Sequence, residues 1–329
     1  MSQFSEAVRN EAFAKYQKGF ALRLTSSLSK DFLKGKKEID LTHTIEDLVK
    51  SVHNYRERGR ASGGPLFELS TKSIFIHGSK SHVQFDFYGT RSEPIELGDL
   101  IFICSVIFKG KKHFEKLTIT QFKMQLKRKS VTSWRIDNEK QLFLLSRFPQ
   151  FTVIRGIIPH KTYDLPNMSD CLGSYGLFFK PGDFTFVSAT NLEAFLGGGK
   201  TVTLPRLASH SDRWQGCSSL CYPMLGDSHY CSNAYIFSDR FLKLNIGELV
   251  FNGLGTYNQQ ARILIQDLIG ELRRRKIKTR EPELSAFLSH LISFPCDDED
   301  NVGNDGNEPG FDVNDGGIGI VHTKIDLGE

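Results

Sequence analysis

One almost uninterrupted apolar run, Leu100–Phe108 (LIFICSVIF), constrains the fold of this chain more than any other segment. The run is rich in β-branched and aromatic side chains, which favour strands. At nine residues it is far shorter than the ~20 that a membrane-spanning helix needs. A strand that is apolar on both faces must be covered on both faces. The run therefore predicts the central strand of a sheet enclosed between two layers.

The segments around this run predict a mixed α/β (α+β) fold, in which helices flank a mixed central sheet. Apolar spacing and capping residues predict helices over 1–34, Asp40–Arg58, Asp137–Phe148, Tyr257–Arg275 and Pro282–Ile292. Alternating patterns predict strands at Ser73–His77, His82–Tyr88, Leu117–Gln125, Phe151–Arg155 and Ile318–Leu327. We expect the first two of these strands to form a hairpin around Gly78-Ser79-Lys80.

Composition divides the chain into five parts. Residues 1–39 predict an N-terminal helical segment, 40–156 a compact core, and 157–296 an additional C-terminal α+β region for a partner or a substrate. Residues 297–317 are rich in Asp, Asn and Gly and predict a flexible acidic linker. Residues 318–329 predict a strand that returns to the fold.

Charge is unevenly distributed along the chain. Residues 297–329 hold ten acidic residues and one basic residue, a net −9, whereas the remaining 296 residues hold 41 basic and 28 acidic ones, a net +13. A positive body attracts polyanions, nucleic acid above all. General solubility is the other explanation, and charge alone does not separate the two.

The cysteines predict a reducing compartment rather than a disulfide scaffold. There are six, and no apolar signal segment is visible near the N-terminus, so we expect a cytoplasmic protein with no membrane segment. Five soft metal ligands fall within 22 residues: His210, Cys217, Cys221, His229 and Cys231. Their spacing departs from the usual C-x2-C zinc pattern, so we expect buried thiols rather than a structural Zn²⁺ site.

Three polar residues stand out beside the central strand. Asp99 opens the apolar run, and Gln121 and Lys123 follow on the next predicted strand. Positions 121 and 123 project to the same face because strand side chains alternate. A hairpin-length loop joins the two strands, which makes them antiparallel neighbours. We therefore expect a carboxylate, an amide oxygen and an ammonium group to converge at one place.

This set of groups suits phosphodiester hydrolysis with Mg²⁺ or Mn²⁺. Hard divalent cations take oxygen ligands, which Asp99, the Gln121 side chain and the Phe122 carbonyl could supply. A bound cation lowers the pKa of a water molecule and stabilises charge on phosphorus, and Lys123 could orient that water. The alternatives are structural: Asp99 ends a turn, Gln121 bonds a neighbouring strand, and Lys123 extends its amine from a strand end.

The order of helix, three strands, helix and strand, with Asp99 opening one strand and Gln121-Phe122-Lys123 on the next, resembles the PD-(D/E)xK nuclease superfamily. It is most similar to the Q-x-K branch, which includes Mrr-like restriction enzymes and effector nucleases of bacterial antiphage systems. The resemblance covers residues 40–156 and implies a restriction-endonuclease-like core. It implies that Asp99 and Gln121 bind the metal and that Lys123 is the catalytic lysine.

The resemblance also implies a further acidic residue from the first helix of the core. Glu46 could fill this place, with Glu96 as the competing candidate. The structural alternative for Glu46 is a surface acid near the positive end of a helix. Two departures from the family pattern are visible. Gly98 rather than proline precedes Asp99, and Gln121 replaces a carboxylate, which leaves the site with one negative charge fewer.

Basic residues follow both strands of the predicted site. They are Lys109, Lys111, Lys112 and Lys116 between the strands, and Lys127, Arg128 and Lys129 after the second. They could hold phosphates beside the scissile bond, or they could simply belong to solvated loops.

These observations predict a Mg²⁺-dependent deoxyribonuclease. The resemblance implies an effector of a bacterial antiphage or restriction system that acts with a sensor or ATPase partner, as a homodimer, or both. The alternative is a catalytically inactive nuclease-fold protein that binds DNA or a partner. No G-x-S-x-G, Walker-A or H-E-x-x-H motif supports another hydrolase class.

Overall fold

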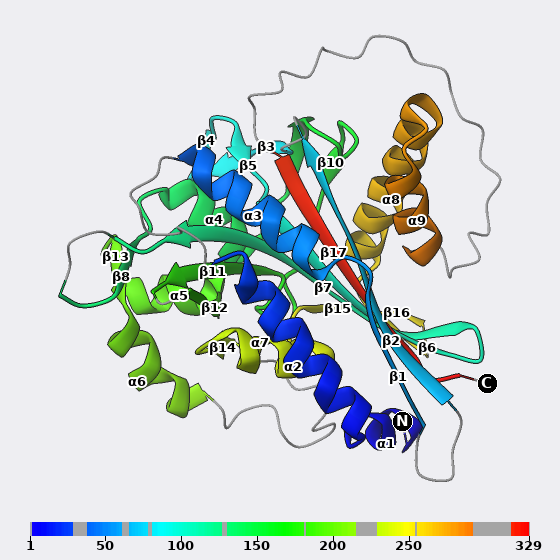
Figure 1. Cartoon of the computed structure of the whole chain (residues 1–329). Helices are drawn as coiled ribbons and strands as arrows, with labels where there is room; N and C mark the ends of the chain where they lie inside the picture. The colour runs from blue at the N-terminus through cyan, green and yellow to red at the C-terminus, as the bar shows by residue number, and fades with distance from the viewer. Residues whose placement is uncertain are drawn as a thin grey trace.

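The computed structural model describes residues 2–28, 38–60, 66–77, 81–126, 130–180, 182–214, 229–253, 255–291 and 317–328. In these residues a mixed sheet of ten strands lies between two helical layers (Figure 1). The predicted α+β fold, with a mixed central sheet flanked by helices, is confirmed. No helix in the described ranges is long and apolar enough to cross a membrane.

The large sheet gathers strands from almost the whole chain. Its main path, in spatial order, is β1 (Tyr55–Arg60), β2 (Leu66–His77), β17 (Gly317–Asp326), β6 (Leu100–Phe108), β7 (Lys111–Met124), β11 (Gly173–Phe179), β12 (Asp183–Ser188) and β14 (Tyr230–Cys231). Off this path, β15 (Glu248–Asn252) pairs with β7 and with β16 (Gly255–Thr256). The sheet is mixed because β17 runs parallel to β6, and β11 runs parallel to β7.

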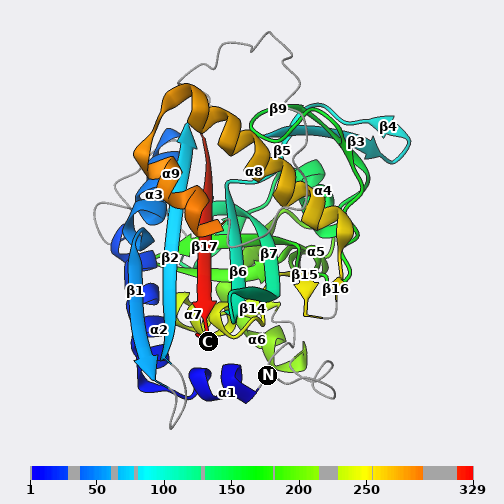
Figure 2. The same ribbon diagram turned by 90° about the vertical axis from the view of Figure 1, so that its right-hand side faces the viewer.

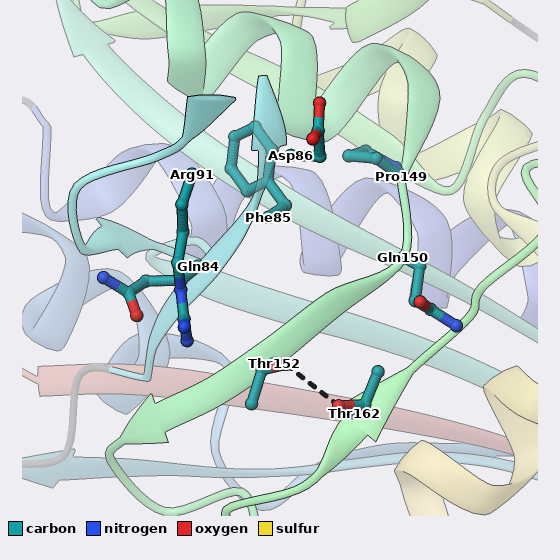
Figure 3. A pocket seen from close by; sticks show the side chains of 8 residues that line it. All are labelled: Gln84, Phe85, Asp86, Arg91, Pro149, Gln150, Thr152 and Thr162. Atoms are coloured by element: carbon teal, nitrogen blue, oxygen red, sulfur yellow. Dashed lines mark hydrogen bonds between the residues drawn. The ribbon is translucent and has the colours of Figure 1, made fainter. Parts of the chain in front are cut away.

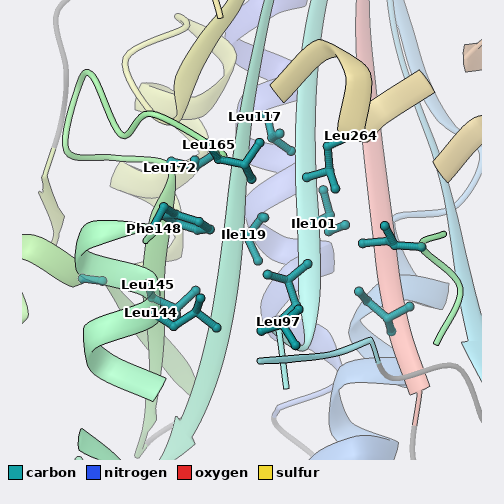
Figure 4. Close-up of a cluster of buried hydrophobic side chains, with 14 of the residues drawn as sticks. Leu97, Ile101, Leu117, Ile119, Leu144, Leu145, Phe148, Leu165, Leu172 and Leu264 are labelled. Atoms are coloured by element: carbon teal, nitrogen blue, oxygen red, sulfur yellow. The ribbon is translucent and has the colours of Figure 1, made fainter. Parts of the chain in front are cut away.

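The central strand β6 buries side chains on both of its faces, as its sequence predicts. Ile101 and Ile103 join one apolar cluster, whereas Leu100 and Phe102 join another. We call the side of Ile101 the first face of the sheet and the side of Leu100 the second face. Figure 4 shows part of the cluster on the first face, where Leu264 of helix α8 approaches Ile101.

Each face has its own helices. Those on the first face are α4 (Glu139–Arg147), α5 (Ala189–Leu196), α6 (Leu204–Trp214), α8 (Gln259–Thr279) and α9 (Pro282–Leu291). Those on the second face are α1 (Ser2–Val8), α2 (Glu11–Ser26), α3 (Glu38–Val52) and α7 (Ala234–Leu242). Figure 2 shows α8 and α9 lying across the strands of the large sheet.

Smaller sheets also pack on the first face. One pairs β3 (His82–Phe87) with β4 (Thr90–Arg91), β5 (Ile95–Glu96) and β9 (Phe151–Arg155), and β9 with β10 (Thr162–Tyr163). Another pairs β8 (Ser133–Arg135) with β13 (Thr201–Thr203).

The hairpin expected around residues 78–80 is therefore wrong. β2 pairs with β1 and β17 in the large sheet, whereas β3 pairs with β9 in the small one. Val83 and Phe85 of β3 bury their side chains with Phe151 and Val153 of β9, which favours this pairing. The strand predicted at Phe151–Arg155 is present, but it does not extend the large sheet.

The helix predicted at Asp40–Arg58 ends early. α3 stops at Val52, and Asn54 takes a left-handed backbone conformation with a φ of 59°. The chain then continues as β1, all six residues of which pair with β2. Arginines recur along this edge strand, and charged side chains protect an open sheet edge from further pairing.

The C-terminal strand lies in the middle of the large sheet. β17 pairs with β2 on one side and with β6 on the other, which confirms the strand predicted at Ile318–Leu327. Through β11, β12 and β17 the sheet joins the predicted 40–156 core to later parts of the chain. Residues 297–316 of the predicted acidic linker lie outside the described residues.

A row of polar side chains crosses the first face under α9, and we call it the histidine row. Ser70 Oγ lies 3.1 Å from His290 Nε2, and the Nδ1 atoms of His290 and His322 are 2.9 Å apart. His322 Nε2 lies 2.9 Å from Ser105 Oγ, and Ser105 donates to Glu115 at 2.8 Å. The row thus ties helix α9 to four neighbouring strands.

The Glu115 side chain, which pairs with Lys112 at 2.6 Å and accepts from Ser105, sets the direction of every hydrogen bond in the histidine row. Its carboxylate only accepts, so Ser105 donates to it and accepts from the Nε2–H of His322. The free Nδ1 of His322 then accepts from His290, whose Nε2 accepts from the hydroxyl of Ser70. Both imidazoles are therefore neutral in the folded protein.

We expect the free energy of unfolding to fall as the pH drops from about 6.5 towards 3. Burial, together with neighbouring positive charges, lowers the pKa of His290 to about 3 and the pKa of His322 well below its usual range. Both groups return to an ordinary pKa of ~6.5 on unfolding. The unfolded chain then binds more protons, so this contribution to stability is complete above pH 6.5 and is lost below it.

Urea unfolding at several pH values measures this effect. Each histidine contributes a slope of up to about 1.4 kcal/mol per pH unit. His290→Gln should reduce the slope, whereas His160→Gln, at an exposed position, should leave it unchanged. Equal slopes for the native protein and His290→Gln would contradict the assignment of a neutral His290.

Candidate functional site

Asp99 and Gln121 meet on the first face, at the end of the sheet where β6 begins. The antiparallel pairing of β6 with β7 sets Leu100 opposite Thr120 and so brings the next residues together. Gln121 Nε2 donates to Asp99 Oδ2 at 2.6 Å, and the backbone N–H of Phe122 donates to the same oxygen at 2.7 Å. The predicted antiparallel pairing is confirmed, and Asp99 and Gln121 are in contact, but through the amide nitrogen of Gln121 rather than the expected oxygen.

Gly98 explains how Asp99 comes so close to β7. A β-carbon at position 98 would lie 2.7 Å from the Ile119 side chain, which is too close for any other residue without a shift of that side chain. The bare backbone packs against β7 instead, and the N–H of Asp99 donates to the Thr120 carbonyl at 3.0 Å. Glycine rather than proline before Asp99 therefore has a packing reason.

Strand β11 adds a polar residue that the sequence analysis missed. Tyr175 is in register with Gln121 on the parallel strand, lies on the first face and is fully buried. Burial raises the pKa of its hydroxyl, and the negative charge of Asp99 raises it further. Asp99, Gln121 and Tyr175 thus form a line across three adjacent strands, which we call the polar row.

No local signal in the sequence could have identified Tyr175. The parallel pairing joins β7 and β11 across a long connection, so their register is a tertiary property. Within β11 itself, Tyr175 stands in a run of buried residues and resembles an ordinary core aromatic.

The polar row offers oxygen atoms that could hold a cation. Asp99 supplies a carboxylate, and the buried Oε1 of Gln121 has no hydrogen-bond partner among the described residues. The Phe122 carbonyl lies on the same edge of β7 as its N–H, which faces Asp99, because both groups of a strand residue point the same way. One carboxylate with neutral oxygens fits Mg²⁺ or Mn²⁺, which retain several waters.

The present orientation of the Gln121 amide does not yet suit a shared cation. Its nitrogen, rather than its oxygen, faces Asp99. Binding of one ion by both side chains would therefore require the amide to rotate, which exchanges the positions of oxygen and nitrogen.

Lys123 lies two residues beyond Gln121 on the same face of β7. It is opposite Leu177 of β11 and half-buried, so its position follows the predicted alternation. Its side chain therefore starts from the same face of β7 as that of Gln121, two residues further along the strand.

The structure does not bring Glu46 to the polar row. Its neighbours Ile45 and Val49 on α3 pack into the cluster of the second face, whereas the polar row lies on the first. Glu46 contacts His77 at 3.2 Å and Lys50 at 2.6 Å. Burial alone would raise its pKa, but the Lys50 hydrogen bond and the charges of His77 and Lys50 outweigh burial and leave the pKa below its usual range. The expectation that Glu46 joins Asp99 is thus not met, because α3 covers the opposite face.

Glu96 lies in a different sheet from the polar row. It belongs to β5 and is opposite His82 of β3. It is half-buried and only three residues before Asp99, but the chain leaves the small sheet between the two.

The basic residues between the two strands do not flank the polar row. Lys109 and Lys111 are exposed at the turn that joins β6 to β7, nine strand residues away from Asp99, or roughly 30 Å. The Lys112 side chain is only 11% exposed and pairs with Glu115 at 2.6 Å. Lys116 is 2% exposed. The prediction that these residues hold phosphates beside the site is therefore wrong, since a hairpin turn lies at the far end of its strands.

Several other predicted groups lie outside the described residues. They are Lys127, Arg128 and Lys129, together with Cys217, Cys221 and the side chain of His210. Of the proposed zinc ligands, His229 Nδ1 contacts Ser188 Oγ at 3.2 Å, and Cys231 is a buried free thiol. Where the chain is described, no three His, Cys, Asp or Glu side chains are grouped to hold a metal ion.

A separate open hollow of about 460 Å³ lies on the small sheet (Figure 3). Its lining is mostly polar and includes Gln84, Arg91 and the hydrogen-bonded pair Thr152 and Thr162, whose hydroxyl oxygens are 2.9 Å apart. None of the predicted site residues lines it.

No protein-family model, no curated protein and no solved structure matches this chain.

We expect Asp99→Ala to destabilise the protein by about 2–4 kcal/mol. The substitution leaves the Phe122 N–H and the Gln121 amide without their buried acceptor. Asp99→Asn keeps one acceptor oxygen and should cost less. Urea unfolding of the three proteins measures the difference, and equal stabilities would show that this carboxylate does not hold β7.

Proposed function

We propose that this chain is a metal-dependent nuclease that hydrolyses phosphodiester bonds of DNA, with Asp99, Gln121 and Lys123 at its centre. One observation carries the proposal. Asp99 and Gln121, two of the residues that sequence reasoning named as ligands, are in contact at 2.6 Å on one face of the sheet. Lys123 follows on the same face of β7.

Each residue has a role in this proposal. Asp99 and the Phe122 carbonyl would hold Mg²⁺ or Mn²⁺ directly, and Gln121 Oε1, in its present orientation, would hold one of the waters that the ion retains. The bound ion supplies Lewis-acid polarisation of a phosphate oxygen and a lowered pKa for a water molecule. Lys123, two residues further along the same face of β7, would supply a positive charge to hold an anionic phosphate oxygen. The two hydrogen bonds to Asp99 Oδ2 hold the carboxylate in place before the substrate arrives.

The resemblance to the PD-(D/E)xK superfamily and the positive charge of residues 1–296 support DNA as the substrate. In that framework the protein is a cytoplasmic effector of a bacterial antiphage or restriction system. It acts with a sensor or ATPase subunit or as a homodimer, so that both strands of a duplex are cut.

One observation favours a second function, that of an inactive nuclease-fold protein that binds DNA or a partner. Asp99 is 4% exposed and Gln121 is 6% exposed, so access for a phosphodiester requires a change at this end of the sheet. Because Glu46 lies on the opposite face, the polar row also has only one carboxylate, that of Asp99.

Cleavage of plasmid and linear DNA with Mg²⁺ or Mn²⁺ tests the two functions. A nuclease should lose roughly 10²- to 10³-fold in rate with Asp99→Asn or Lys123→Met, because each change removes a charged group from the site. A chelator should abolish the cleavage. Asp99→Asn is preferred to Asp99→Ala because it preserves an acceptor for β7.

Two matched controls make this assay specific. Lys109→Met removes a lysine at the far end of the hairpin, and Glu46→Gln removes an acid from the opposite face, so both should cleave like the native protein. Cleavage that survives Asp99→Asn and Lys123→Met would refute the site. DNA binding without cleavage, both by the protein alone and together with a sensor or ATPase subunit encoded beside it, would favour the second function.

A further inference from the structure

Two polar atoms on neighbouring residues of the polar row lack hydrogen-bond partners among the described residues. They are Gln121 Oε1 and the Tyr175 hydroxyl, and both are buried. Gln121 and Tyr175 are in register on β7 and β11, and both side chains lie on the first face. Adjacent parallel strands are about 4.8 Å apart, so the two side chains start as immediate neighbours.

These atoms are complementary but do not bond each other. The amide oxygen only accepts, whereas the phenol can donate as well as accept. A buried polar group without a partner costs roughly 1–3 kcal/mol, so these two atoms are unfavourable unless a ligand or a water molecule bonds to them. A ligand oxygen without a proton could accept a hydrogen bond from the Tyr175 hydroxyl. A water molecule could do this and also donate a hydrogen bond to Gln121 Oε1.

The contact with Asp99 leaves Gln121 Oε1 available to a ligand. Asp99 holds Gln121 through the amide nitrogen at 2.6 Å, which leaves Oε1 turned away from the carboxylate. The charge of Asp99 also acts on the Tyr175 hydroxyl. Tyr175 is therefore the donor on the β11 side of a row whose acceptors come from β6 and β7.

We infer that Tyr175 is a further residue of this site and that its hydroxyl donates to a water or hydroxide oxygen held against Gln121 Oε1. The inference rests on the proposed nuclease function, in which this oxygen would also belong to the hydration shell of the cation. Tyr175 is then a positioning residue, because it acts on the substrate only through that water.

The experiment compares native protein with Tyr175→Phe, which removes only the hydroxyl. Tyr230→Phe is the matched control, because its hydroxyl is likewise buried without a partner in the described residues but lies on β14, away from the row. Three quantities are measured for each protein. They are the free energy of unfolding without metal, the Mn²⁺ dissociation constant, and the single-turnover rate of DNA cleavage with Mg²⁺.

Tyr175→Phe should be at least as stable as the native protein without metal, because it removes an unpaired buried group. Its Mn²⁺ affinity should fall about threefold to tenfold, and its cleavage rate should fall about tenfold or more. DNA affinity measured with Ca²⁺ should not change. If Tyr175 served only packing, Tyr175→Phe would lower stability. It would not lower the Mn²⁺ affinity and the cleavage rate while leaving the DNA affinity unchanged.

The possible failures are distinguishable. A native protein that neither binds Mn²⁺ nor cleaves DNA overturns the proposed function and this inference with it. A native protein that does both, with Tyr175→Phe unchanged, overturns the inference alone. Equal losses in Tyr175→Phe and Tyr230→Phe also overturn it, because they would reflect a general effect on the core.

Discussion

Enclosure of the central sheet between two apolar layers is the constraint on which the rest of this structure depends. β6 and β17 are removed from water on both faces. Every polar side chain on these strands must therefore find its partner inside the protein. The chain meets this requirement by collecting its buried polar groups into rows that run across neighbouring strands, so that each residue is bonded by the next strand in the sheet.

The two rows on the first face differ in how completely they are paired. In the histidine row every side chain is hydrogen-bonded to its neighbour, and the series of bonds ends at Glu115. In the polar row, Gln121 Oε1 and the Tyr175 hydroxyl lack partners in the described residues. Complete pairing serves the docking of α9 and the C-terminal strand. Incomplete pairing reduces stability, and such departures from consistent packing are typical of functional positions.

Expectations based on local pattern were confirmed where the signal itself was local. The apolar run Leu100–Phe108 is a covered central strand, and a short turn brings Asp99 to Gln121 because a hairpin leaves few other registers. The expected pairing of β2 with β3 and the expected place of the lysines were wrong. β2 and β3 are consecutive in the sequence but lie in different sheets, and the lysines between β6 and β7 lie at the opposite end of the strands from Asp99.

The sequence by itself thus determined the fold class, the central strand and the meeting of a carboxylate with an amide at its beginning. These follow from side-chain period, turn length and burial, which are properties of short segments. Only the tertiary structure decided that Glu46 lies on the opposite face, that β17 enters the middle of the sheet, and that Tyr175 completes the polar row. Those placements depend on pairings between segments that are distant in the sequence. Burial of the whole sheet selects these pairings, and no short sequence pattern specifies them.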